Sequence, residues 1–174
     1  MNSNAPLKNA EWMILVEGAY GRAMLRAHGL EMELASMLLC NATATSRGQV
    51  VGERVTRLTK EQILRLPLGL LIKHFVAAFS VSEDIADELD NLLFFRNELA
   101  HRISRIILKG LSKQDHQGWP QVIRELKDIA SFFDDADELL APYRRASAAA
   151  LGLTEDELVE AAGRIYPGMA NVGR

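Results

Sequence analysis

The sequence SEDIADELDNLLFFRNELAHRISRIILK, residues 82–109, indicates the fold class of this chain most clearly. Its core-facing positions recur at alternating steps of four and three residues, the spacing of one face of an α-helix. These positions are Ile85, Leu89, Leu92, Arg96, Leu99, Ile103 and Ile106. The acidic first turn, Glu83 and Asp84, suits the positive end of a helix dipole. The segment is therefore predicted to be a long amphipathic helix.

Further helices are predicted on both sides of this segment. Apolar residues at helical spacing predict helices over 10–41, over 59–79 with a break at Pro67, and from Pro120 to Pro142, which should kink or stop the helix. Residues 42–58 resemble a polar connection. No segment alternates polar and apolar residues as a strand does. We therefore expect an all-α antiparallel four-helix bundle over residues 1–150.

Two pairs of residues have the spacing of a helix capping box. Thr59 and Gln62 would open the second helix, and Thr154 and Glu157 would open a short extra C-terminal helix that ends near Ala162. We therefore expect residues 151–174 to form this short helix and a tail.

Composition narrows the classes of function. The net charge of −3 argues against a strong nonspecific binder of nucleic acid, although it leaves room for a local basic patch. The apolar run at 12–16 is too short to span a bilayer, and the first residues lack the features of a secretory signal. Cys40 is the only cysteine, so we expect a small buried hydrophobe and no internal disulfide. A cytoplasmic location without a membrane partner is expected.

One charged residue interrupts each of two apolar stripes. Arg96 lies in the stripe quoted above, and Glu31 lies in the stripe of the first helix between Ala27 and Leu34. Because an unpaired buried charge is costly, two interruptions of opposite sign predict a structural ion pair between Glu31 and Arg96. The alternative is that Arg96 reaches the edge of the bundle with only its stem buried.

The opposite face of the 82–109 helix mixes apolar and polar side chains. Five residues fall within one sector of that helix: Phe94, Asn97, His101, Arg105 and Leu108. A purely solvated face would not need Phe94 and Leu108, so we predict an interface with a polar centre, used by a homodimer. The alternative for His101 is an ordinary surface histidine.

Basic residues gather in the later part of the same helix. Arg102, Arg105 and Lys109 follow Arg96, whereas the first part is acidic. These side chains complement the negative end of the helix dipole, and they would also attract a phosphate backbone. They are the candidate RNA-binding residues.

Residues 96–102, Arg-Asn-Glu-Leu-Ala-His-Arg, resemble the signature of HEPN domains. That signature is an arginine, a polar neighbour and a histidine after four to six intervening residues, and the family is all-α with the motif on a late helix. Many members are homodimeric, metal-independent endoribonucleases in which two motifs face one cleft. The resemblance implies that His101 is the general acid or base, that Arg96 holds the scissile phosphate, and that Asn97 orients either group.

The same resemblance implies a reaction and partners. The substrate would be RNA, cleaved to 2′,3′-cyclic phosphate ends without a cofactor. The protein would be a toxin or defence component, with an antitoxin protein as partner. Two positions depart from the pattern: Ile103 stands where some family toxins have a modified tyrosine, and Arg96 and His101 lie about 140° apart around an ideal helix. The side chains of Arg96 and His101 can meet only if the long arginine side chain bends around the helix, if the helix is distorted, or if a second copy of the chain supplies one of the two residues.

A second resemblance points to a protein without catalysis. The layout of the first helix, residues 68–72 and the motif helix is similar to that of mannitol-operon-repressor-type helical proteins, which implies a regulatory or protein-interaction module. Other chemistries lack their motifs. The four histidines are scattered with no zinc-ligand spacing, so no metal is expected, and there is no glycine-rich phosphate loop or serine nucleophile elbow.

Overall fold

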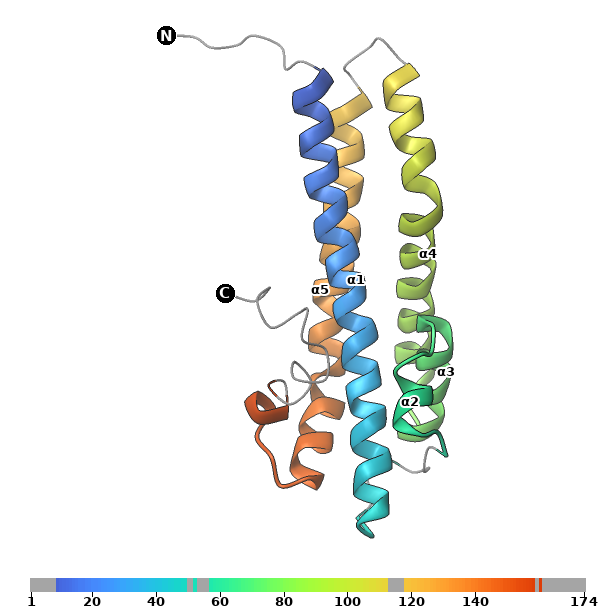
Figure 1. Cartoon of the computed structure of the whole chain (residues 1–174), viewed down its shortest axis with the longest axis vertical. Coiled ribbons are helices and arrows are strands. Elements are labelled where there is room, and N and C mark those ends of the chain that lie inside the picture. The colour runs from blue at the N-terminus through green and yellow to red at the C-terminus, as the bar shows by residue number, and fades with distance from the viewer. Residues whose placement is uncertain (1–8, 50–51, 53–56, 113–117, 159, 161–174) are drawn as a thin grey trace. The chain divides into compact units, whose positions relative to one another are not determined.

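The computed structural model describes residues 9–49, 52, 57–112, 118–158 and 160 of the chain. In this part of the chain the helices are α1 (Asn9–Ser46), α2 (Lys60–Ile63), α3 (Leu68–Phe79), α4 (Glu83–Ser112) and α5 (Trp119–Ala150), shown in Figure 1. One further turn of helix spans 155–158. The described residues include no strand, which confirms the prediction of an all-α protein.

The chain divides into two compact units, and the three long helices each contribute to both. Unit 1 comprises the described parts of Met1–His28 and Leu92–Asp135, and unit 2 comprises those of Gly29–Asn91 and Ala136–Arg174. The motif Arg96 to His101 therefore belongs to unit 1. The capping boxes at Thr59 and Thr154 belong to unit 2.

The core of unit 1 has a face of small side chains on α1. Ala19, Ala23 and Ala27 are buried at four-residue steps. The other two helices of the unit contribute larger buried side chains: Leu92, Leu99, Trp119, Leu126 and Phe133. Glycines can let a neighbouring helix approach closely, but a Cβ at Gly18 or Gly21 would meet nothing within 4 Å. The alanines have that role instead, since both glycines lie on the exposed side of α1.

The core of unit 2 is centred on α3, whose bounds are those predicted. Pro67 is the N-cap, with an extended backbone that fits the restricted proline ring, and the helix begins directly after it. Phe75, Phe79 and Tyr143 form an aromatic cluster with edge-to-face contacts at centroid distances of 5.3 and 5.9 Å to the tyrosine. Thr59 forms the predicted capping box at the start of α2. Pro67 and the Thr59 capping box, which act within a few residues, were therefore sufficient to predict where α3 and α2 begin.

Gly52 contacts the C-terminal end of α3. Its φ is +80°, and a Cβ at this position would lie 2.3 Å from the carbonyl oxygen of Ala78. Both the backbone conformation and the space therefore require glycine.

Two helices run five or more residues past their predicted ends. α1 continues five residues beyond Asn41 to Ser46, because Asn41 and Ala44 are buried and packing extends the helix into the polar segment. α5 continues through Pro142 to Ala150, so of the two effects predicted for Pro142, a kink or a stop, the stop is wrong. Leu140 and Ala148 are buried on either side of the proline, and this packing outweighs the backbone hydrogen bond that proline cannot make.

After α5 the chain reverses direction at Gly152, whose φ is +70°. The predicted capping box follows: the amide of Thr154 donates to Glu157 Oε2 at 2.8 Å, and the amide of Glu157 donates to Thr154 Oγ1 at 3.2 Å. The turn places Leu158 against Cys40 and Ala148, which confirms that Cys40 is buried. The predicted end of this helix near Ala162 lies outside the described residues.

Candidate functional site

The motif lies on the part of α4 that belongs to unit 1. Leu92 and Leu99 are buried, whereas Asn97 and His101 are exposed, so the helix presents the polar pair away from its core face. His101 lies off the apolar stripe, as the sequence predicted. Asn97 and His101 are four residues apart and therefore neighbours on the helix surface.

Arg96 is half-buried. Glu31, its predicted partner, is also half-buried and belongs to unit 2. The ion pair between them stays a prediction. The three candidate RNA-binding side chains, Arg102, Arg105 and Lys109, lie on α4 but outside the side chains that the structure describes.

Three phenylalanines form an aromatic cluster next to the motif. Phe95 stacks on Phe132 of α5 with ring centroids 4.8 Å apart and an interplanar angle of 14°. Phe94 meets the edge of Phe95 at 5.7 Å. Phe94 is 57% exposed and Phe132 is 41% exposed. The sequence singled out Phe94, but it gave no sign of Phe132, because the contact between α4 and α5 is not local.

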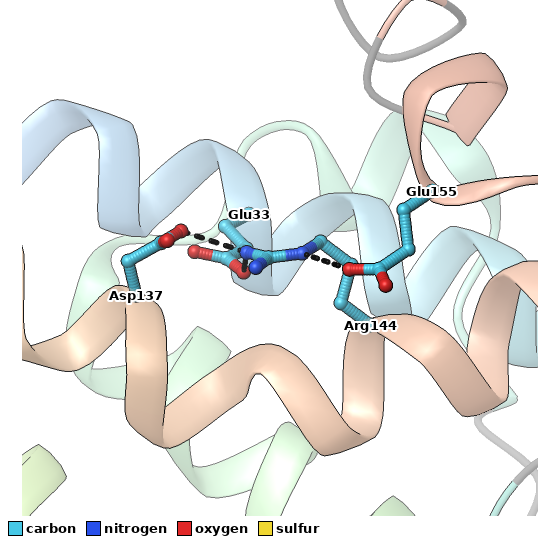
Figure 2. Close-up of polar contacts among 4 residues, drawn as sticks. All are labelled: Glu33, Asp137, Arg144 and Glu155. Carbon is cyan, nitrogen blue, oxygen red and sulfur yellow. Dashed lines mark hydrogen bonds and ion pairs between the residues drawn. The ribbon is translucent and has the colours of Figure 1, made fainter.

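Unit 2 contains a charged cluster that the sequence did not reveal. The Nη1 atom of Arg144 donates to Glu33 Oε1 at 2.5 Å and to Asp137 Oδ1 at 2.7 Å, and its Nε donates to Glu155 Oε2 at 3.2 Å. Figure 2 shows the guanidinium between the three carboxylates, with Glu33 reaching it from α1 and Glu155 from the short C-terminal helix. The Arg144 and Glu33 side chains are only 16% and 18% exposed.

Burial and charge act in opposite directions within this cluster. Burial raises the pKa of Glu33 to about 7, although the positive charge of Arg144 opposes the shift. Burial alone would lower the pKa of Arg144, but its hydrogen bond to Asp137 and the charge of Glu33 outweigh this and raise it. Arg144 therefore stays charged at every ordinary pH, and Glu33 is the member whose charge changes near neutrality.

The charged cluster around Arg144 and the exposed face of α4 differ in the chemistry that they can support. Among the described residues, Arg144 pairs with three carboxylates, which suits a structural role in joining α1, α5 and the helical turn 155–158 within unit 2. The α4 face instead exposes an imidazole and an amide to solvent. It can accept or donate a proton and hydrogen-bond a ligand, so it is the better candidate site.

The described residues contain neither a candidate metal site nor a helix that could cross a membrane. No group of three or more histidine, cysteine, aspartate or glutamate side chains there has the arrangement of a metal site. None of the helices in that part of the chain combines the length and apolar content needed to cross a membrane.

Comparison with known proteins does not identify this chain more closely than as an all-α protein. No protein-family model matches the sequence, and no curated protein or solved structure matches the chain.

Proposed function

We propose that this chain is a HEPN-like endoribonuclease that cleaves RNA without a metal ion, as a toxin or a component of a defence system. The observation that carries the proposal is the exposure of Asn97 and His101 on α4, opposite the buried Leu92 and Leu99. A histidine that must reach a substrate has to lie off the core, and this one does. The motif Arg96 to His101 supplies the other support.

The proposed chemistry is an internal transfer at phosphorus. His101 accepts the proton of the ribose 2′-hydroxyl, the 2′-oxygen bonds to the adjacent phosphorus, and the bond to the 5′-oxygen breaks. The leaving oxygen takes a proton from a second acid, and Arg96 offsets the charge that develops on the phosphate. The products are a 2′,3′-cyclic phosphate and a 5′-hydroxyl. A histidine suits both proton transfers because its ordinary pKa lies near neutral pH.

The proposal extends to assembly and partners. A homodimer with a HEPN-like four-helix arrangement would supply the second acid as His101 of the other copy. RNA would be held by Arg102, Arg105 and Lys109, whose positive charge attracts phosphate. A toxin of this kind also needs an antitoxin protein to restrain it. Light scattering tests the dimer directly, since a monomer mass at high concentration would remove it.

The proposed activity is tested by incubating purified protein with single-stranded RNA in EDTA at low ionic strength and by identifying the fragment ends. We expect 2′,3′-cyclic phosphate and 5′-hydroxyl ends, and no cutting of DNA, which lacks the 2′-hydroxyl. Fragments with 5′-phosphate ends would contradict the proposed chemistry. A failure to cut any of a varied set of RNAs would favour the regulatory module instead.

A further inference from the structure

The aromatic cluster beside the motif gives a more specific account of the substrate. We infer that Phe94 and Phe132 form a platform on which bases of single-stranded RNA stack beside His101. This inference rests on the proposed function, since it assigns RNA as the ligand. Every base has a π face, so exposed aromatic rings bind single strands with little dependence on sequence.

The geometry of the cluster suits stacking. Phe95 contacts both other rings, and its near-parallel stack on Phe132 holds the ring of Phe132 in a fixed orientation. Phe132 still leaves 41% of its surface to solvent, and Phe94 leaves 57%. Two exposed rings on different helices are thus linked through a third, so the platform is preformed and little side-chain freedom is lost on binding.

The position of the cluster connects it to the motif. Phe94, Asn97 and His101 follow one another at steps of three and four residues, so they share one face of α4. The rise from Phe94 to His101 is about 10 Å along the helix axis, at about 1.5 Å per residue. A base on Phe94 would therefore keep the strand beside the imidazole.

The size of the exposed aromatic surface favours bases over a protein partner. At about 150–250 Å² per aromatic side chain, the exposed parts of Phe94 and Phe132 amount to roughly 200 Å². A stable protein interface needs about 800 Å² on each partner. Three residues close to these rings in the sequence, Asn97, Ser131 and Asp135, are polar and exposed. This inference departs from the dimer expected from the sequence, whose interface included Phe94: the second copy would instead pack beside His101 and leave Phe94 free.

Charge near the platform explains why stacking is needed. Asp134 is paired with Arg26 at 2.9 Å, but Asp135 is exposed three residues after Phe132. A carboxylate there repels phosphate, so attraction between charges alone would not hold RNA at this place. Stacking on neutral rings supplies binding that salt does not screen.

The test is a binding measurement with a probe that cannot be cut. A fluorescent single-stranded 2′-O-methyl oligoadenylate has no free 2′-hydroxyl, and an abasic strand of the same length has the same phosphates without bases. Phe94→Leu and Phe132→Leu keep an apolar side chain but remove the π face. The control is Leu70→Ala on α3 of unit 2, because Leu70 is 43% exposed and lies outside the cluster.

We expect each phenylalanine variant to weaken binding of the oligoadenylate about 5- to 150-fold, the range that follows from about 1–3 kcal/mol per stacked base. The abasic strand should bind weakly to every form, and Leu70→Ala should match the wild type. Asp135→Asn should tighten binding at low salt, because it removes a repulsive charge without touching a ring.

Three outcomes would overturn the platform. Equal binding by the wild type and both phenylalanine variants would remove stacking, as would equal affinity for the oligoadenylate and the abasic strand. A change from dimer to monomer in Phe94→Leu by light scattering would show that a second copy covers the ring. The proposed function can fail independently of the platform. Base-dependent binding without cleavage of ordinary RNA would support the platform and contradict the nuclease activity. Cleavage of RNA at the same rate by the wild type and by both phenylalanine variants would support the nuclease activity and contradict the platform.

Discussion

The guanidinium of Arg144 lies 2.5 Å from the carboxylate of Glu33, a residue 111 positions earlier in the sequence. Both side chains are largely buried, so this contact is energetically different from an ion pair at the surface. The contact joins α1 to α5 within unit 2, and the ion pair of Arg144 with Glu155 adds the helical turn 155–158. The stability of that unit should depend on this contact.

Arg144→Met should destabilise the fold by about 3–5 kcal/mol, because it leaves Glu33 buried without its cation. The matched control is Arg26→Met. Arg26 pairs with Asp134 at 2.9 Å, but their side chains are 59% and 53% exposed, so its loss should cost less than about 1 kcal/mol. Urea unfolding of the two variants gives the comparison. Equal losses of stability would show that burial does not distinguish the two pairs.

The free energy of unfolding should fall as pH rises from about 4.5 to about 7 because of Glu33. Burial raises the pKa of this carboxyl from 4.5 to about 7, so the folded state keeps a proton that the unfolded state has lost over this range. Below the range the carboxyl is neutral in both states. Above it the full cost of a buried charge is present, at most about 3 kcal/mol.

Glu33→Gln isolates this contribution, since glutamine resembles the protonated carboxyl at every pH. The difference in unfolding free energy between the variant and the wild type should move in favour of the variant as pH rises from about 4.5 to about 7. Urea unfolding at several pH values measures it. A difference that stays constant with pH would mean that Glu33 is already ionised in acid, with Arg144 offsetting its burial.

Cys40 should react slowly with a thiol reagent in the native protein. It is buried against Ala148 and Leu158, and burial raises the pKa of its thiol to about 11, so little thiolate forms at neutral pH. Leu158→Ala should speed the reaction by opening the cover, whereas Leu70→Ala should not. A fast reaction in the wild type would show that the turn at 155–158 opens readily in solution.

The sequence was most informative where local chemistry decides the structure. Pro67 predicted the start of α3, and Thr59 and Thr154 predicted their caps, because each signal acts within a few residues. The helix past Pro142 was not predicted, since packing on both sides of the proline overrides its local effect.

The candidate site was only partly predictable for the same reason. The periodicity of α4 placed His101 off the core, and the structure confirms its exposure. In the first helix, periodicity selected Glu31 as the intruding charge, but the carboxylate held by Arg144 is that of Glu33, two residues later. Arg144, the partner of Glu33, lies on α5, and the periodic pattern of one helix contains no information about which residue of another helix contacts it. The role of Phe132 could not be predicted either, because Phe95, which it contacts, is far away in the sequence.

The central claim is that His101 transfers a proton in RNA cleavage, and its most direct test is the rate of cleavage in EDTA by the His101→Ala variant. His28→Ala is the matched control, because His28 is another exposed histidine of unit 1 and lies outside the motif. We predict that the wild type and His28→Ala cut single-stranded RNA at similar rates. His101→Ala should keep its fold, judged by unchanged urea unfolding, and lose cleavage by about 100-fold or more. Cleavage by His101→Ala at the wild-type rate would contradict the account.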